Sequence, residues 1–208
     1  MSSALQPVPR SGVPQRIGTA RRYLMCPPTY FAVNYAINPW MDPSRPVDTA
    51  LAMAQWEALA GTYRALGHTV DVIDPQPGLP DMVFAANSGT VISGVVLGAR
   101  FRHAERSAEA EHYRQWFAAH GASGVLLPSA VNEGEGDLAW TGRLLLAGTG
   151  FRTEPAAHLE AQEVLGVPTV SLRLVDPRYY HLDTCLLVLD DSPSGPLIAY
   201  YPGAFSPG

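Results

Sequence analysis

The sequence predicts an α/β protein built from structural repeats of about fifty residues. Strand-like and helix-like segments alternate along the chain. In addition, three spans that each run from a polar residue to a phenylalanine begin 50 and then 46 positions apart. A period of this size is typical of supersecondary units that bury their faces against their neighbours.

The three spans share more than their spacing. The first two each extend over fourteen positions, and in both the phenylalanine is followed by arginine and then by a helical pattern. The third is longer because it contains an insertion at 191–196. The spans run from Asn87 to Phe101, from Asp137 to Phe151 and from Asp183 to Phe205. Matched lengths favour repeated units over a chance succession of hairpins.

The N-terminal elements are predicted as strand, helix and strand. A short strand at 22–26 precedes a helix at 47–66, and Gly67 is suited to end that helix before a strand at 68–73. The apolar residues of the helix recur at helical spacing and predict one buried face. These residues are Leu51, Trp56, Leu59, Tyr63 and Leu66.

Three hairpins follow, each consisting of two β-rich runs around a short turn. We expect them at 82–97, 137–146 and 184–200. Helices at 107–120 and 155–165 and short strands at 125–127 and 169–174 separate the hairpins.

The pattern also predicts a helix beginning at Ser206, because serine caps helices and Pro207 suits the first helical position. Since the sequence stops at Gly208, we expect the last repeat unit to be incomplete. Residues 1–20 are rich in Ser, Pro, Gly and Arg and are expected to form a flexible tail. The expected domain is 21–208, in truncated form.

Composition and charge argue against several classes of protein. The chain has 208 residues, of which 47% are hydrophobic and 16% charged, as in ordinary globular proteins. Its net charge of -5 argues against nucleic acid as a partner, because such binding needs a basic surface. No apolar run approaches the roughly 18 residues of a membrane span, and no secretory signal is recognisable. With only two cysteines, Cys26 and Cys185, we expect a reduced, cytoplasmic protein.

Polar residues gather at the start of each predicted hairpin. In the run Glu133-Gly-Glu-Gly-Asp137, strand alternation would place three carboxylates on one face, and the glycines would let the backbone approach a neighbour. A metal site, a solvated acidic loop and a guanidinium pocket all remain open. We favour the guanidinium pocket and expect no metal, because paired carboxylates match a guanidinium and one histidine is few for a metal.

His181 and Asp183 would lie on the same side of a strand. Histidine titrates near neutral pH, and a nearby carboxylate suits it to acid–base work. An isolated histidine in a strand is usually structural, but His181 is in register with Asn87 and Asp137 at the head of a hairpin. We therefore predict that His181 is a general acid and base.

Four short motifs together resemble the guanidino-group modifying enzymes, which include amidinotransferases, dimethylarginine dimethylaminohydrolases, arginine deiminases and arginine dihydrolases. The resemblance runs from about residue 23 to the end of the chain. The motifs are PDMVFAAN at 80–87, EGEGD at 133–137, GTGFRT at 148–153 and HLDT at 181–184. The resemblance implies a pentein-like, pseudo-fivefold α/β propeller of ββαβ units, here incomplete and lacking the last unit.

The resemblance also implies a reaction without a cofactor. In this family a cysteine thiolate attacks the guanidinium carbon and forms a covalent thiouronium intermediate. His181 would be the general acid and base, and Glu135, or else Glu133, would hold the guanidinium. Asn87 and Asp183 would lie near the reacting group. The residues implied to bind the rest of the substrate are Asp81, Arg106, Arg152, Asn38 and Asp137.

Two departures from the family pattern bear on activity. Asn87 stands where the family motif has aspartate, which removes a charge and resembles the arginine dihydrolases. The family's nucleophilic cysteine lies near the C-terminus, in a unit that this sequence lacks. Cys26 matches nothing catalytic. Cys185 would share a strand face with His181, but a cysteine in such a place usually packs in the core.

The sequence therefore predicts a hydrolase acting on the guanidino C–N bond of arginine or a methylated arginine, with its thiol missing. The alternatives are a non-catalytic guanidine-binding pseudoenzyme and an inactive fragment. An open strand edge would also favour association into a homo-oligomer.

Overall fold

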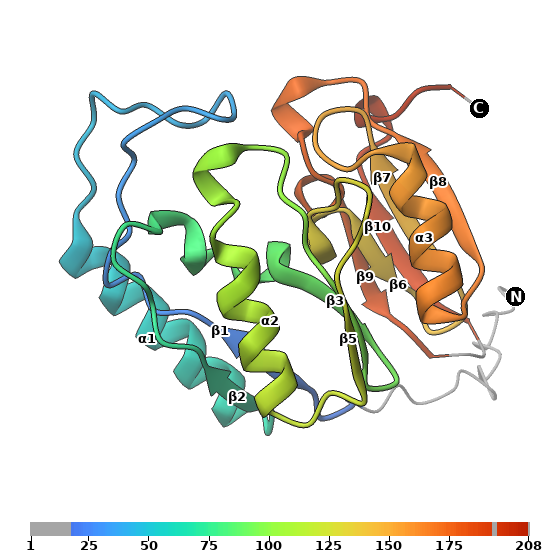
Figure 1. The fold of residues 1–208 in the computed structure, drawn as a ribbon, viewed down its shortest axis with the longest axis horizontal. Helices are drawn as coiled ribbons and strands as arrows, with labels where there is room; N and C mark the ends of the chain where they lie inside the picture. The colour runs from blue at the N-terminus through green and yellow to red at the C-terminus, as the bar shows by residue number, and fades with distance from the viewer. Residues whose placement is uncertain (1–17, 193–194, 208) are drawn as a thin grey trace, which may run out of the picture.

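The structure is a computed structural model that describes residues 18–192 and 195–207. The flexible tail predicted for 1–20 falls almost entirely outside these residues. The described residues alternate strands and helices, which confirms the α/β prediction (Figure 1). None of the helices among them is long and apolar enough to cross a membrane.

The N-terminal unit is a βαβ arrangement. Strands β1 (Arg22–Met25) and β2 (Thr69–Val72) pair in parallel and are joined by α1 (Thr49–Ala65). The side chain of Asp48 accepts the backbone N–H of Leu51 and so caps the first turn of α1.

Two units of ββαβ topology follow. In each, an antiparallel hairpin is joined by a parallel strand that comes after a helix, with strand orders β3-β4-β5 and β6-β7-β8. The first consists of β3 (Gly89–Ile92), β4 (Val95–Gly98), α2 (Glu109–Ala119) and β5 (Gly124–Leu126). The second consists of β6 (Leu138–Trp140), β7 (Leu145–Thr149), α3 (Pro155–Leu165) and β8 (Thr169–Arg173). The two matched units agree with the repeat that the sequence predicts.

Another antiparallel hairpin follows, formed by β9 (Leu186–Asp190) and β10 (Leu197–Tyr200). The chain then returns to the end of β8, where Phe205 bridges Leu174. Ser206 lies in irregular structure, so the helix predicted to begin there would extend beyond the described residues.

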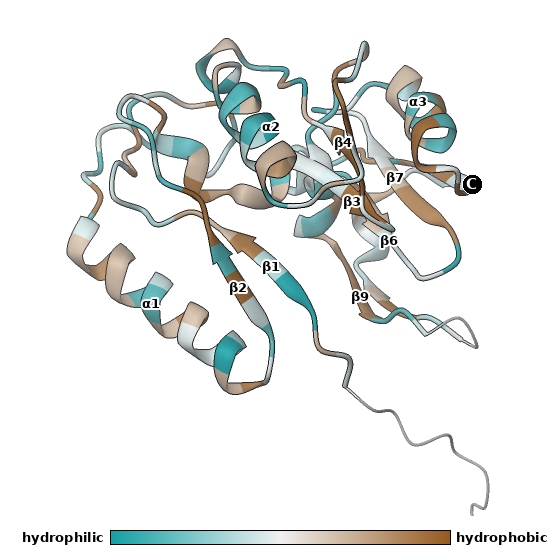
Figure 2. Ribbon diagram, turned by 60° about the horizontal axis from the view of Figure 1, so that its bottom comes forward, coloured by the Kyte–Doolittle hydropathy of each residue, from teal (hydrophilic) through white to brown (hydrophobic). Residues whose placement is uncertain are grey.

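The units lie beside one another in chain order. In Figure 1, α1 is at the left, α2 in the centre and α3 at the right. Figure 2 shows hydrophobic residues concentrated in strands of the two ββαβ units, whereas α2 carries many hydrophilic residues. Leu97, Leu138 and Leu145, from β4, β6 and β7, are almost completely buried and belong to one cluster. The core therefore joins the two ββαβ units.

The structure corrects the starts of the predicted hairpins. Three 3-10 turns stand where strands were expected, and each runs into the first strand of its hairpin. They are η2 (Ala85–Ser88), η4 (Gly134–Gly136) and η6 (Leu182–Thr184). The turns are held by hydrogen bonds to distant parts of the chain, which strand periodicity does not reveal.

The apolar face predicted for α1 is only partly buried. Leu51, Leu59 and Leu66 are 54%, 46% and 68% exposed, whereas Ala60 is fully buried. The reason is that α1 packs on a sheet of only two strands, which is too small to cover its apolar stripe. The hairpin β9–β10 also exposes apolar side chains, including Leu187 and Leu189.

Candidate functional site

Three turns meet at one place in the fold. η4 contacts both η2 and η6, and each turn precedes the first strand of its own unit. Because the units are similar, equivalent positions of the repeats are brought together. Asn87, Glu133, Asp137 and His181 lie on these turns or immediately before or after them, and all four are buried. The polar residues that the sequence analysis places at the starts of separate hairpins therefore lie together in the fold.

His181 occupies the centre of this cluster. Its Nε2 lies 3.2 Å from Glu133 Oε2 and its Nδ1 lies 3.2 Å from Asp137 Oδ2. Burial opposes a charge on the ring, but the two carboxylates outweigh burial and raise the pKa of His181 to about 9. The ring is therefore an imidazolium at neutral pH, with a proton on each nitrogen.

Glu133 links His181 to an arginine. Its Oε2 also accepts a 2.7 Å hydrogen bond from Arg152 Nη1, and its Oε1 accepts the backbone N–H of Arg102. Burial would raise the pKa of Glu133, but His181 and Arg152 together lower it to about 2. Arg152 donates a further hydrogen bond to the carbonyl of Ile37. Glu133 is thus a charged carboxylate between two cations.

Asp137, rather than Asp183, is the carboxylate on the other side of the histidine ring. It accepts the backbone N–H groups of Thr153 and Leu182, at 3.2 and 3.1 Å. The predicted pairing of His181 with Asp183 on one strand face is wrong, because the chain forms the 3-10 turn η6 there. The turn leaves His181 buried and Asp183 exposed.

The acidic run also differs from the prediction. Because η4 is a turn rather than a strand, Glu135 is exposed and its Oε1 lies 3.5 Å from the backbone nitrogen of Val91, away from His181. The expectation that the glycines allow close approach holds. Gly134 has φ of 55°, and a Cβ on Gly136 would lie 2.2 Å from Asn87 Nδ2.

Arg106 is held inside the protein. It forms a buried ion pair with Glu109, at 2.8 Å, and donates a 2.8 Å hydrogen bond from Nη1 to Asn87 Oδ1. Sequence reasoning missed Glu109. The available signal for this ion pair was the spacing: Glu109 starts α2 and follows Arg106 by three positions, and residues so spaced are neighbours on a helix.

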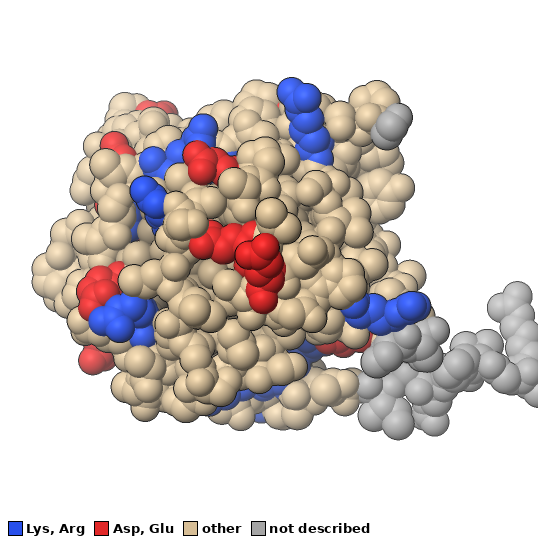
Figure 3. All heavy atoms as spheres, turned by 45° about the vertical axis from the view of Figure 1, so that its right-hand side comes forward, with Lys and Arg blue, Asp and Glu red and all other residues tan. Residues whose placement is uncertain are grey.

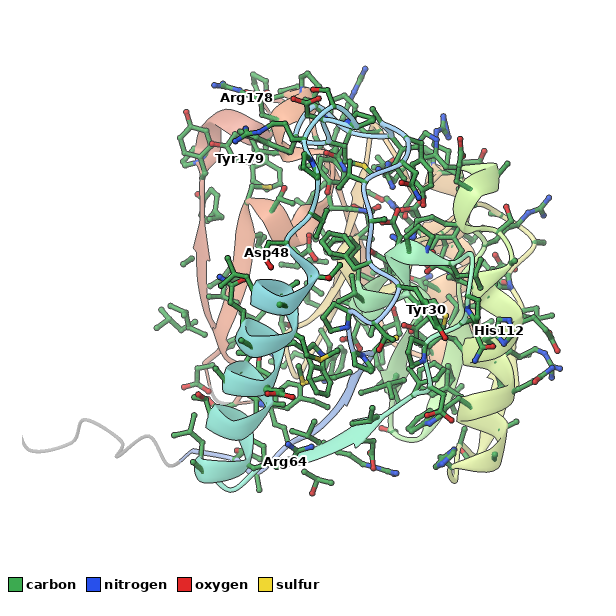
Figure 4. All side chains as sticks on the ribbon, turned by 90° about the vertical axis from the view of Figure 1, so that its left-hand side faces the viewer. Tyr30, Asp48, Arg64, His112, Arg178 and Tyr179 are labelled. Atoms are coloured by element: carbon green, nitrogen blue, oxygen red, sulfur yellow. The ribbon has the colours of Figure 1, made fainter. Side chains whose placement is uncertain are left out.

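A segment of 29–46 lies over the cluster and is attached to it by side chains. The hydroxyl of Tyr35 donates to Asp81 Oδ2 at 2.9 Å, while Asp81 Oδ1 is buried without a hydrogen-bond partner among the described residues. The Asn38 side chain accepts the backbone N–H of Trp40, whose indole N–H donates to the carbonyl of Arg178. Figure 4 shows the Arg178 side chain at the edge of the molecule beside this segment.

A cavity of about 550 Å³ opens beside the cluster. Its polar wall contains all but three of the predicted site residues: Asn38, Asp81, Asn87, Arg106, Arg152, His181 and Asp183. Glu133 and Asp137 contact His181 but do not line the cavity, and neither does Glu135. On the face drawn in Figure 3, the blue arginine side chains are scattered among Asp and Glu and form no continuous stripe.

Neither cysteine is placed as a nucleophile. Cys26 is fully buried beside Tyr113, and burial raises the pKa of its thiol to about 12. Cys185 packs against Leu174 and Ala204, and burial raises the pKa of its thiol to about 11. A thiol reacts as the thiolate, so both are poor nucleophiles at neutral pH. Neither lines the cavity.

The charge on His181 predicts a pH-dependent contribution to stability. Since its pKa rises from 6.5 to about 9 on folding, the contribution is fully present below pH 6.5 and is lost as the pH rises through about 9. We expect the stability of the wild type relative to His181→Gln to fall by roughly 3 kcal/mol across this range, measured by urea unfolding.

His158→Gln provides a control of opposite sign. His158 is also buried, but burial lowers its pKa, so its contribution is lost as the pH falls. If the difference in the free energy of unfolding between the wild type and His181→Gln did not change with pH, the conclusion that His181 is charged would be wrong.

The close approach at Gly136 predicts a second effect. In Gly136→Ala the new Cβ would displace Asn87, and we expect a loss of about 1–3 kcal/mol in the free energy of unfolding. Gly61→Ala in α1 is the control, because its Cβ meets nothing and alanine favours a helix. Urea unfolding of both variants measures the contrast, and equal stabilities would contradict the packing described.

Comparison with known proteins identifies relatives over nearly the whole chain. No family model matches. The sequence is 54% identical over 198 residues to N(G),N(G)-dimethylarginine dimethylaminohydrolase of Mycobacterium tuberculosis, covering 95% of this chain and 64% of that protein. It therefore spans a little under two thirds of this relative's length.

Solved structures give the same result. The crystal structure of the N-terminal domain of ArgZ, described as an arginine dihydrolase from cyanobacteria and bound to substrate, matches with a TM-score of 0.82. It is 41% identical, and the match covers 89% of this chain and 68% of that one. Dimethylarginine dimethylaminohydrolase of Pseudomonas aeruginosa, 19% identical with a TM-score of 0.72 over 83% of this chain and 68% of that one, shares the fold. The chain belongs to the family of guanidino-group modifying enzymes.

Proposed function

We propose that the chain forms the substrate-binding and proton-transfer part of a hydrolase that cleaves a guanidino C–N bond. The observation that carries this proposal is the buried His181 imidazolium, held between Glu133 and Asp137 at the wall of a cavity. The relatives support it, since one is named a dimethylarginine dimethylaminohydrolase and another an arginine dihydrolase.

The groups left free at the cavity favour arginine or a methylated arginine as the substrate. Arg152 uses only two of its five N–H donors on described residues and can bind a carboxylate in two-point fashion. Asp81 Oδ1 is a buried acceptor without a partner in the part of the chain that the structure describes, and Asp183 adds a carboxylate at the same cavity. A ligand with an anionic group and one or more cationic groups would pair with both Arg152 and the two carboxylates.

His181 would transfer the protons. In the proposed reaction a thiolate attacks the guanidinium carbon, and the imidazolium protonates the amine as its C–N bond breaks. Water then attacks the thiouronium carbon and gives a proton to the neutral imidazole, and the C–S bond breaks to release the ureido product. The two carboxylates keep the ring protonated until the amine departs.

The thiol in this proposal comes from outside these 208 residues. Cys26 and Cys185 do not line the cavity, and both have raised thiol pKa values. We propose that 21–208 is one domain, and that its units are part of a pentein-like, pseudo-fivefold propeller whose remaining unit carries the cysteine. The exposed apolar faces of α1 and β9 support an incomplete assembly.

A non-catalytic guanidine-binding protein is the second candidate. It is favoured by the same observation on the cysteines, because a binding cavity needs no thiol. An inactive fragment would neither bind a guanidine nor hydrolyse it.

Calorimetric titration of the chain with L-arginine and N(G),N(G)-dimethylarginine, combined with assays for ornithine, citrulline and ammonia, tests the function. We expect binding without turnover, and we expect Arg152→Gln to weaken binding at least tenfold because it removes a charged donor. Arg178→Gln, an exposed arginine outside the cavity, is the control and should leave affinity unchanged. Clear turnover would contradict the proposal that the reacting thiol lies outside these residues. Absence of binding would contradict the proposed function.

A further inference from the structure

The helices of the two ββαβ units are packed on more than one side. Leu165 of α3 belongs to one buried cluster with Leu138 from its own sheet and Leu97 from the sheet of the preceding unit. Tyr113 of α2 belongs to another buried cluster, with Cys26 and Ile73 directly after the preceding strands β1 and β2. In both units the helix therefore packs on the sheet that comes before it in the chain.

The first helix and the last hairpin each lack this partner. α1 belongs to the N-terminal unit, so no described sheet precedes it. The hairpin β9–β10 is the last sheet, and among the described residues no α-helix follows it. α1 is thus a helix without a preceding sheet, and β9–β10 is a sheet without a following helix. Elements of these two kinds pack on each other in the ββαβ units.

The uncovered side of α1 is apolar and carries no charge. At about 100° per residue, Leu51, Leu59 and Leu66 fall within roughly a quarter of the helix circumference, and all three are exposed. The charged residues of α1, Glu57 and Arg64, lie on a different side. Figure 4 is drawn from the side of α1 and shows the helix at the surface, with Arg64 near its C-terminal end. An uncharged apolar stripe of this kind is suited to pack on a sheet.

The outer face of β9–β10 corresponds to a face that a helix covers elsewhere in the protein. Leu187 and Ala199 pair across this hairpin in the position that Thr90 and Leu97 hold in β3–β4. Thr90 and Leu97 are almost completely buried, and Leu97 lies in the cluster that includes α3. Leu187 and Ala199 are exposed instead, as is Leu189 on the same strand face. They are the positions that a helix would cover.

We propose that two copies of this chain pair with twofold symmetry, the α1 of each copy packing on the β9–β10 face of the other. The pair would repeat the contact of α3 with β3–β4. The stripe from Leu51 to Leu66 is about 22 Å long and the five-residue strand β9 about 16 Å, so the helix spans the hairpin. A twofold pair covers both faces of both copies. The contact needs no guanidine ligand, so it is independent of the proposed function.

Sedimentation equilibrium of the 208-residue chain, over a hundredfold range of concentration, tests the pair. We expect the wild type to reach twice the monomer mass. Leu51→Glu and Leu187→Lys should each raise the dissociation constant roughly a hundredfold, because each change places a charge in both contacts of the pair. Leu159→Glu is the control. It replaces another exposed helical leucine, 59% exposed against 54% for Leu51, and should leave the mass unchanged.

Thermal unfolding checks that the variants fold. The melting temperature of the wild type should rise with protein concentration, whereas the two variants should melt cooperatively at a temperature that does not change with concentration. Leu66→Glu, at a 68% exposed position of the same stripe, replaces Leu51→Glu if that variant does not fold. A monomeric wild type would overturn the proposal and leave a continuation of the chain as the occupant of both faces. A dimer that survives either substitution, or a mass above two copies, would overturn it as well.

Mixing the two variants separates this contact from other kinds of dimer. In a mixed pair, the intact α1 of the Leu187→Lys copy meets the intact hairpin of the Leu51→Glu copy, and the other contact brings opposite charges together. An equal mixture should therefore dimerise roughly tenfold more tightly than either variant alone. A mixture no tighter than the separate variants would show that α1 does not pack on the partner's hairpin.

Discussion

The buried carboxylate of Asp137 is the constraint on which the site depends. It accepts backbone N–H groups from Thr153 and Leu182 and lies against the ring of His181. One side chain therefore joins the turn before β6, the loop before α3 and the turn before β9. A buried charge without partners costs several kcal/mol, so the three segments and the charged histidine stabilise one another.

The remaining charges are arranged around that centre in pairs. Glu133 lies between His181 and Arg152, and Glu109 pairs with Arg106. Each of these charges is paired with an opposite charge within the protein, which fixes its position before any ligand arrives and suits a preorganised site. Arg152 keeps donors, and Asp81 keeps one oxygen, that have no partner among the described residues, and both residues line the cavity that a zwitterionic ligand would enter.

Local patterns were sufficient to predict much of the fold. α3 was predicted within its observed bounds because Pro155 starts it and Gly166 ends it in the left-handed conformation. The two ββαβ units follow from the matched spans. The turns η2, η4 and η6 were missed because contacts with distant parts of the chain hold them, such as the hydrogen bond from the Leu182 N–H to Asp137. That error placed Asp183 beside His181 and Glu135 on the site's face, since both were predicted from strand alternation.

The central claim is that His181 is held as an imidazolium by Glu133 and Asp137. Titration of its ring ¹⁵N signals by NMR, assigned with His181→Gln, tests this claim directly. The structure predicts that both nitrogens are protonated at pH 7 and that the ring titrates with a pKa of about 9. A neutral ring at pH 7, titrating at or below the ordinary histidine value, would contradict the account.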